Sequence, residues 1–385
     1  MELAVHSVPA RRSILVLAAL TLTAILAFAL VSRLVTRYRA NERQLAWHVF
    51  EQGMTFYNAG NPARALDNFR TALTFDPDNF QYQLSLARAL RDSGNLAEAE
   101  TYLSSLWQRN PEDGVINLAM ARLAVRRGSV TDAVRYYHNA IYGAWAKDPE
   151  TNRSSARLEL IHFLIQHKAN TLAESELITF VQTLPPDPAS HLQAAGLYGE
   201  IQDYDQALEV YESVLKLDPH NQAALAGAGR AAFQLERYHT AQQYLTRAVE
   251  ADHSDQKSQQ TLETANLILS VDPFRRHISD AERNRRLVNA FNLAGVRLQA
   301  CASSAGINLN TPTSPPNPLQ TLQLSWNNLK PQLTTLRSAG ETDLPDSIMD
   351  VVSQIETQTA QQCGPPTGVD LALLLAARDR GMVDQ

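Results

Sequence analysis

Cysteine, glycine and aromatic residues are scarce in this chain. Two cysteines among 385 residues are too few for a disulfide-rich scaffold or a four-cysteine zinc site. Glycine (16 residues) and aromatic residues (7%) are fewer than a large β-sandwich or a dinucleotide-binding enzyme normally contains. The formal net charge of −6 argues against a dedicated nucleic-acid binder, which is usually basic. With 44% hydrophobic residues the chain can still bury a core, and its composition favours an all-α fold.

Long apolar runs are absent except for residues 13–32, which hold 20 residues without a charge. A helix rises about 1.5 Å per residue, so this run matches the roughly 30 Å hydrocarbon core of a membrane. We therefore predict an N-terminal tail (1–12), a transmembrane helix (13–32) and a basic juxtamembrane segment (33–45). A cleaved signal peptide is the alternative, because Ala27-Phe28-Ala29 fits an A-x-A cleavage site.

The side of the membrane on which the large domain lies stays open. Two arginines and the amino terminus precede the apolar run and four arginines follow it, which weakly favours the cytoplasm by the positive-inside rule. The low lysine content (five Lys beside 29 Arg) and two cysteines that could pair favour the opposite side. We expect a single-pass, bacterial-type protein of the inner membrane, of unresolved orientation.

A period of 34 residues begins at residue 46. Six repeats, with a six-residue insertion around Pro149, fill residues 46–255. Most repeats have a small residue at position 8, and larger apolar residues stand at positions 11 and 24 in most of them. Alanine occupies position 20 in all six: Ala65, Ala99, Ala133, Ala173, Ala207 and Ala241. Small residues at positions 8 and 20 would let two antiparallel helices approach closely, and a hairpin with two apolar faces must stack on its neighbours.

This pattern resembles the tetratricopeptide repeat family over just over half of the chain. The resemblance implies a right-handed α-α superhelix of about six repeats, of which the fourth departs most from the family pattern. It also implies a partner-binding groove lined by positions 2, 5, 9, 12 and 13 of the first helix in each repeat. The candidate groove residues in this sequence are Trp47, Phe50, Met54, Tyr57, Asn58, Arg88, Arg91, Arg122, Arg126, His162, Arg230 and Phe233. Gly196, Gly199 and Glu200 hold the corresponding positions 9, 12 and 13 of the fifth repeat.

Arginine is concentrated at these positions although residues 46–255 carry a net charge of −9. Arginine binds carboxylates through paired hydrogen bonds. We therefore hypothesise a groove that accepts an acidic or C-terminal segment of a protein partner. The alternative is that these arginines are solvated or form ion pairs with neighbouring repeats.

Residues 256–385 lose the repeat pattern and are predicted to form a helical region that caps the repeats or binds a partner of its own. Helices are expected at 261–270, from Ser279 onward, and in three further segments: about 319–338, 345–361 and 370–378. Cys301 and Cys363 fall near predicted helix ends, where they form either a disulfide or two buried free thiols. A disulfide would place this region in an oxidising compartment such as the periplasm.

Motifs of enzymes are missing. The chain has no H-E-x-x-H, Walker loop or G-x-S-x-G, and its one dinucleotide-like stretch, Gly227–Ala232, lies inside a repeat helix. We expect no catalytic residue, no cofactor, no metal ion and no nucleic-acid partner. The expected function is a membrane-anchored scaffold that binds a protein partner during complex assembly or biogenesis. A self-associating organiser (a homo-oligomer) and an accessory subunit of an enzyme complex are the alternatives.

Overall fold

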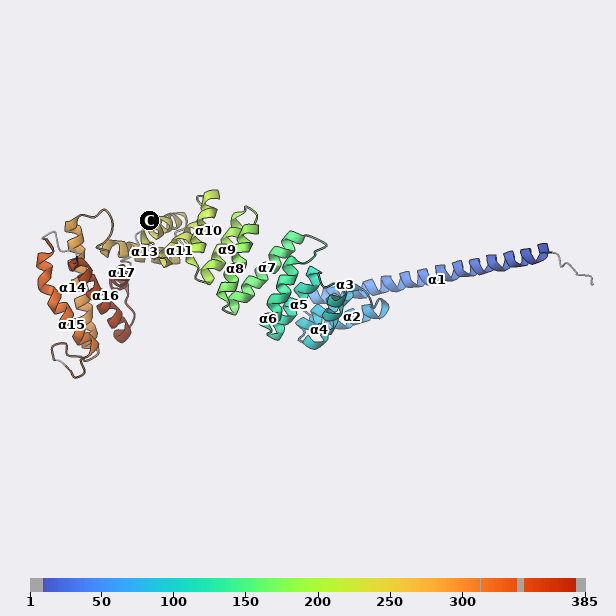
Figure 1. Ribbon diagram of the computed structural model, residues 1–385, viewed down its shortest axis with the longest axis horizontal. Helices are drawn as coiled ribbons and strands as arrows, with labels where there is room; N and C mark the ends of the chain where they lie inside the picture. Colours follow the sequence, from blue (N-terminus) through green and yellow to red (C-terminus); the bar gives the residue numbers. More distant parts are fainter. Residues whose placement is uncertain (1–9, 312, 338–342, 379–385) are drawn as a thin grey trace, which may run out of the picture. The chain divides into compact units, whose positions relative to one another are not determined.

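Helices make up the regular structure of the computed structural model, which describes residues 10–311, 313–337 and 343–378 (Figure 1). Within these ranges no strand occurs, and the extended backbone forms one isolated bridge between Asp113 and Ala144. The predicted all-α class is therefore confirmed. The chain forms two compact parts, an N-terminal part up to Phe163 and a C-terminal part from Leu164.

The first helix, α1 (Ala10–Asn58), runs without a break through the predicted transmembrane, juxtamembrane and first repeat segments. The predicted tail falls outside the described residues except for its last three positions, which belong to α1. Apolar side chains from Leu15 to Val35 are 42–76% exposed, and Figure 1 shows this half of α1 extending beyond the other helices of its part. By length and composition the helix can cross a membrane, a test that a signal sequence near the N-terminus also passes.

The repeats are pairs of short helices that follow the 34-residue period. In the N-terminal part they comprise α2 (Pro62–Phe75), α3 (Phe80–Asp92), α4 (Leu96–Arg109), α5 (Gly114–Arg127), α6 (Val130–Tyr142) and most of α7 (Pro149–Gln166). The C-terminal part continues with α8 (Asn170–Thr183), α9 (Pro188–Glu200), α10 (Tyr204–Leu217), α11 (Gln222–Gln234) and α12 (Tyr238–Ala251). The first helices of adjacent repeats also contact one another, as α3 does with α5 and α9 with α11.

Alanine at position 20 marks the closest approach of the two helices in each repeat. All six of these alanines are 0–1% exposed. Position 8 completes the contact: a Cβ on Gly53 would overlap the ring of Phe69, which is itself fully buried. A larger side chain at either position would push the helix pair apart, because protein interiors are close-packed.

The turn between the two helices of each repeat uses a left-handed residue at position 15. Glycine fills it in the first three repeats, with φ of 76° at Gly60, 84° at Gly94 and 73° at Gly128. The later repeats place non-glycine residues there, with φ of 57° at Lys168, 65° at Gln202 and 60° at Glu236. The same backbone geometry is therefore kept without the residue that adopts it at least cost.

An Asp or Asn at position 34 caps the first helix of the following repeat. Its side-chain oxygen accepts hydrogen bonds from backbone N–H groups two or three residues ahead, which a helix start otherwise leaves unpaired. The capping residues are Asn79, Asp113, Asp187, Asn221 and Asp255. Asp255 caps α13 (Gln256–Val271), so α13 begins where the first helix of a seventh repeat would begin.

The end of the third repeat folds back onto the start of its own first helix. Trp145 donates a hydrogen bond to the Ala140 carbonyl (2.8 Å), and its ring occupies the space where Gly114 has no side chain. Backbone bonds of 2.8 Å join Ala144 to Gly114 and to Glu112. The six extra residues, 148–153, follow this closure, and five of them lengthen α7 at its start, so α7 begins earlier than the pattern predicts.

The end of the chain is a helical bundle. It contains α14 (Asp280–Ser304), α15 (Pro318–Leu329), the 3₁₀ helix η1 (Lys330–Arg337), α16 (Leu344–Cys363) and α17 (Gly368–Arg378). The segment expected as one helix at 319–338 is instead α15 followed by η1. Helix α17 packs against both α16 and α13, so it takes the place beside α13 that the second helix of a repeat would hold.

One arginine and two cysteines tie the bundle together. The structure joins Cys301 to Cys363 in a disulfide, with Cα atoms 5.7 Å apart, linking the ends of α14 and α16. Arg297 of α14 pairs with Glu356 (2.9 Å) on α16 and with Asp370 (2.8 Å) on α17. Glu356 is fully buried, and this burial, assisted by the nearby Asp370 charge, raises its pKa to about 8 against the opposing effect of Arg297.

The left-handed position in the sixth repeat predicts a stabilising substitution. Glu236→Gly should raise the free energy of unfolding by up to about 1 kcal/mol, because the relieved φ strain exceeds the entropy that glycine adds to the unfolded chain. The urea midpoint of the full chain measures it. Gly94→Ala, at the same position of the second repeat, should shift the midpoint the other way. A lower midpoint for Glu236→Gly would contradict this account of the turn.

The buried Glu356 predicts a pH dependence. Its folded-state pKa of about 8 lies above the ordinary 4.5, so the folded protein keeps a proton that the unfolded chain releases between these values. Stability of the bundle should therefore fall as the pH rises from 4.5 to 8. Glu356→Gln, which is neutral throughout, should match the parent chain near pH 5 and exceed its free energy of unfolding at pH 8 by roughly 3 kcal/mol.

Fluorescence of Trp326 reports on this bundle, because its ring stacks on Phe291 with centroids 5.1 Å apart. Urea unfolding would be followed in a chain whose other three tryptophans are replaced by Phe. Equal slopes of stability against pH in the parent and Glu356→Gln chains would show that Glu356 does not titrate in this range.

Candidate functional site

The aromatic end of the predicted groove is partly core. Phe50 is only 2% exposed, with its ring 4.7 Å from that of Tyr82 and 5.5 Å from that of Phe69. Phe50 therefore offers no surface to a partner, because α2 and α3 cover the face of α1 on which it lies. Trp47 stays 47% exposed, Met54 packs partly into the same core, and Asn58 is exposed at the end of α1.

Tyr57, Arg91 and Asp92 form a bonded group between α1 and α3. The Tyr57 hydroxyl donates to Asp92 Oδ2 at 2.6 Å, and Arg91 donates to both Asp92 oxygens at 2.7 and 3.0 Å. Although burial works against it, these hydrogen bonds hold the pKa of Asp92 below its ordinary value. Burial and the bond to Asp92 raise the pKa of Tyr57. Asp92 thus remains an anion that neutralises Arg91.

Arg122 of α5 has its own counter-ion. It donates to Glu159 of α7 through Nε (2.9 Å) and Nη2 (2.5 Å), the bidentate geometry of a strong arginine–carboxylate pair. This bond raises the pKa of Arg122, and burial beside Glu159 raises the pKa of Tyr137 to about 12. For Arg122 the interpretation as a pair with a neighbouring repeat is therefore the right one.

Arg88 has no such partner. It lies partly buried on α3, and its Nε atom is buried without a hydrogen bond among the described residues, as is Nη1 of Arg91. Burial lowers the pKa of Arg88, and the neighbouring charges of Arg122 and Arg91 lower it further. A buried cation with an unpaired N–H beside two other cations is a place where an anion would be stabilised.

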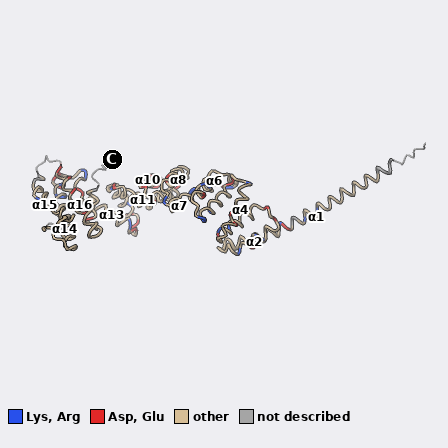
Figure 2. The backbone as a smooth tube through the Cα atoms, turned by 60° about the horizontal axis from the view of Figure 1, so that its bottom comes forward, with Lys and Arg blue, Asp and Glu red and all other residues tan. Residues whose placement is uncertain are grey.

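We call Arg88, Arg91, Arg122 and Arg126 the arginine cluster. Arg126 is exposed near the end of α5, and its charge lowers the pKa of Asp92. Asp92 and Glu159 supply two negative charges against four positive ones, so the cluster keeps an excess of positive charge. Figure 2 shows acidic and basic residues interspersed along the repeat helices. The excess of positive charge is therefore a local property of the arginine cluster on α3 and α5. His162, in contrast, is exposed and bonds the Leu158 carbonyl of its own helix.

The C-terminal part contains a pocket of about 650 Å³ over the first helices α9, α11 and α13. Its lining includes positions 9, 12 and 13 of α9 (Gly196, Gly199, Glu200) and of α11 (Arg230, Phe233, Gln234). Lys257, Gln260, Thr261 and Thr264 of α13 form another wall. Helix α17 closes one side with Leu371 and Leu375.

Arg230 is less available to a partner than its predicted groove position implies, because it already contacts two residues of this chain. Its guanidinium lies 3.8 Å from Asp255 and donates to the Ser258 hydroxyl at 3.2 Å. It therefore holds α11 to the start of α13. Phe233 meets Tyr238 edge to face, with centroids 5.4 Å apart, and also faces the pocket.

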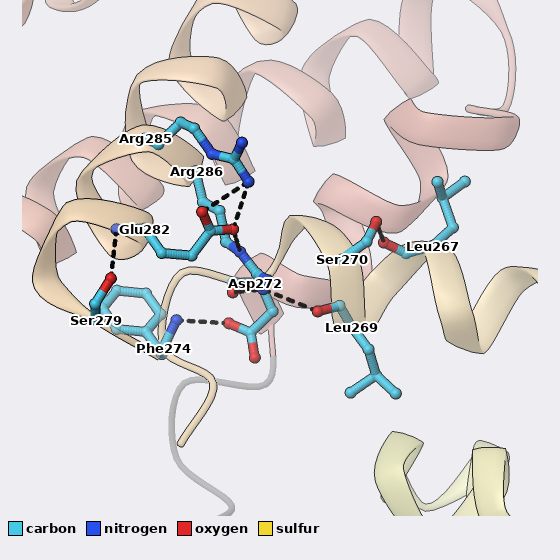
Figure 3. A network of polar contacts seen from close by, with 9 residues as sticks. All are labelled: Leu267, Leu269, Ser270, Asp272, Phe274, Ser279, Glu282, Arg285 and Arg286. Atoms are coloured by element: carbon cyan, nitrogen blue, oxygen red, sulfur yellow. Dashed lines mark hydrogen bonds and ion pairs between the residues drawn. The ribbon is translucent and has the colours of Figure 1, made fainter. Parts of the chain in front are cut away.

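The basic stretch after α13 is structural. Figure 3 shows Arg285 and Arg286 both directed to Glu282, with Arg286 also donating to the Leu269 and Asp272 carbonyls at 2.9 and 2.8 Å. These bonds fix the corner between α13 and α14, and Ser279, where the sequence predicts a helix to begin, caps α14 by accepting from the Glu282 N–H. The cluster is a paired helix start and not an open anion site.

One site residue was not among the predicted groove positions. Asp92, which neutralises Arg91, holds groove position 13 of the second repeat, whereas Glu159, which neutralises Arg122, lies outside the predicted positions. Glu159 lies 37 residues beyond Arg122, close to one period, so an acidic residue on the next first helix was the available signal. Among the described residues, no group of three or more His, Cys, Asp or Glu side chains is placed to hold a metal ion.

The comparisons with known proteins agree with this geometry. A family model for the tetratricopeptide repeat matches residues 57–123 and 201–265, and its second match extends into α13. The chain contains tetratricopeptide repeats. Its helix pairs have the architecture of a protein-interaction scaffold.

The chain is similar over part of its length to two known proteins and to one solved structure. Tetratricopeptide repeat protein 21A of Mus musculus is 27% identical over 175 residues, 45% of this chain and 13% of that protein. Cellulose synthase 1 operon protein C of Komagataeibacter xylinus is 29% identical over 149 residues, 36% of this chain and 11% of that protein. The chain therefore spans a small fraction of either relative. A solved C-terminal part of a repeat protein from Cytophaga hutchinsonii is 14% identical, with 62% of this chain and 93% of that chain covered and a TM-score of 0.44.

Proposed function

We propose that this tetratricopeptide repeat protein is a membrane-anchored scaffold that captures an acidic or C-terminal segment of a protein partner. The apolar half of α1 would hold the chain in the membrane, and the arginine cluster would bind carboxylates of the partner. Anchoring confines the search for a partner to the membrane surface and raises the local concentration of both proteins. In this role the protein contributes to the assembly or biogenesis of a membrane complex.

The unpaired Arg88 is the observation that carries this proposal. A carboxylate at this point would accept from Nε of Arg88 and from Nη1 of Arg91, which are the buried N–H groups of the arginine cluster that lack acceptors among the described residues. Such charge-assisted hydrogen bonds are short and strong when water is excluded. Exposed Trp47 and Asn58 on α1 add an apolar and a polar contact on either side of Tyr57.

We further propose that the soluble part lies on the oxidising side of the membrane. A disulfide across the 62-residue separation would stabilise the bundle by roughly 4 kcal/mol through loop closure, a gain that reduction in the cytoplasm would remove. The low lysine content of the chain, five residues, is compatible with a location on the oxidising side. The four arginines that follow the apolar run favour the cytoplasmic side instead.

Replacement of Arg88 tests the capture of a partner. With a photoreactive phenylalanine at Asn58, the full chain in its native membrane should cross-link to one dominant heterologous protein, identified by mass spectrometry. Arg88→Met should reduce that product at least tenfold, because the partner carboxylate loses its buried donor. Thermal unfolding of Arg88→Met should be no easier than that of the parent chain, since the substitution removes an unpaired buried group.

Arg70→Gln is the matched control, because Arg70 forms an exposed pair with Glu98 away from the cluster. This variant should leave the cross-link unchanged. Arg122 is a poor test, since its loss would strand Glu159 in the folded protein. An equal yield with Arg88→Met would exclude the arginine cluster as the capture site. Links only to other copies of the chain would identify a self-associating organiser instead.

Thiol alkylation tests the side of the membrane. Intact cells would be quenched in acid, and the denatured chain treated with a maleimide that adds mass to each free thiol. We expect no added mass before reduction and two additions after it. Cys301→Ser should leave Cys363 open to alkylation without reductant and so serves as the control. Two free thiols in the unreduced parent chain would place the bundle in the cytoplasm.

A further inference from the structure

The part of α1 that follows the apolar run, residues 33–45, carries an exposed apolar stripe. Leu34, Tyr38 and Leu45 are 59%, 66% and 47% exposed. With Asn41 they are spaced by four, three and four residues, which is the spacing of the seam positions a and d in the heptad abcdefg of a coiled coil. The charged residues of this segment hold other positions of the heptad. We call the residues at the seam positions the heptad stripe.

The heptad stripe continues backward through the membrane half of α1. Counting back from Leu34 by threes and fours reaches five apolar residues: Val31, Ala27, Ala24, Leu20 and Leu17. Inside an apolar run such matches are expected, so the specific signal is the segment 33–45, and the membrane half supplies length. Together they cover about four heptads, enough for a coiled coil. The alanines at two seam positions would let a second helix approach closely in lipid.

Neither lipid nor the repeats cover the end of the heptad stripe. Leu45 lies about 20 Å along the helix beyond Ser32, at about 1.5 Å per residue. A headgroup layer adds only about 5–8 Å to each side of the hydrocarbon core, so it ends well before Leu45. Ala46 and Phe50, which belong to the core of the first repeats, lie about 100° and 140° around α1 from Leu45. The heptad stripe therefore faces away from the repeat core.

The charges beside the heptad stripe complement those of a second, parallel copy. In a parallel pair, a residue at position g of one helix faces position e, five residues later, of the other helix. Arg37 holds position g and Glu42 holds the next position e, so a pair of copies has two contacts of opposite charge. Glu42 also accepts from the Tyr38 hydroxyl, and this bond raises the pKa of Tyr38. Copies inserted in the membrane by one route are parallel.

We propose that residues 33–45, together with the membrane half of α1, form a parallel two-stranded coiled coil with a second copy of this chain. The apolar residues of the heptad stripe pack against the same residues of the other copy. Paired Asn41 amides fix the register, because an amide both donates and accepts. Arg37 of each copy binds Glu42 of the other.

This inference rests on the membrane anchor of the proposed function and not on capture by the arginine cluster. A dimer carries two arginine clusters, so a partner with two acidic segments binds both and gains avidity. Asn58, the position of the photoreactive probe for a partner, lies beyond the heptad stripe on the same helix.

Cysteine cross-linking of the full chain in its native membrane tests the heptad stripe. Asn41→Cys and Leu45→Cys would be oxidised with copper phenanthroline, and dimers measured on non-reducing gels. Both should give roughly fivefold more dimer than Thr36→Cys and Arg43→Cys, which hold position f on the opposite face of the helix. The parent chain measures any contribution of the native cysteines.

Charge exchange tests the pairing of two copies. In the Leu45→Cys chain, Arg37→Glu or Glu42→Arg alone should lower the dimer yield about threefold, because like charges then face each other. The double variant Arg37→Glu, Glu42→Arg should restore the yield, since opposite charges meet again in exchanged places. Arg43→Glu is the matched control, because it reverses an arginine of the same segment at position f and should leave the yield unchanged.

Equal dimer yields on both faces of the helix, or a double exchange that restores nothing, would overturn the proposal. An alkaline carbonate wash separates this failure from that of the anchor. A chain that stays in the membrane without dimers specific to the heptad stripe keeps its anchor and loses the coiled coil. Release of the chain by the wash would overturn both. Arg88→Met should keep the dimer, so capture of a partner and pairing of copies fail separately.

Discussion

Close approach of paired helices is the constraint on which the rest of this protein depends. The alanines at position 20 are 0–1% exposed, and the absence of a side chain at Gly53, position 8 of the first repeat, leaves space for the ring of Phe69. This contact sets how far apart the two helices of a repeat lie. It thereby fixes which side chains of the first helices reach the surface shared by neighbouring repeats, where the arginine cluster and the pocket of the C-terminal part occur.

Residues at that shared surface are not optimised for stability. Arg88 is a partly buried cation whose Nε lacks an acceptor among the described residues, and Gly196 and Gly199 are helix-interior glycines where a Cβ would meet no atom within 4 Å. Proteins accept such losses where function requires a particular group or an open space. The arginine cluster concentrates positive charge that carboxylates can neutralise.

The C-terminal bundle follows the last repeat and also supplies α17, the helix that packs against α13. Helix α13 begins with the same Asp cap as the repeat helices, and α17 covers it after a detour of nearly 100 residues through the bundle. The disulfide and Arg297 fix the position from which α17 returns. Because α17 also lines the pocket, the geometry of that site depends on a bundle that the family pattern does not describe.

The 34-residue period determined the repeat helices and the alanines between them, since helical contacts within a repeat are local and recur at fixed spacing. Burial of Phe50, pairing of Arg122 with Glu159 and isolation of Arg88 were settled by tertiary structure alone. Arg88 and Arg122 hold the same position in successive repeats, yet only one faces a carboxylate on the next first helix. The physical reason is that periodicity specifies backbone positions, whereas charge pairing and cavity shape depend on side chains that arrive from other repeats and, for α17, from the far end of the sequence.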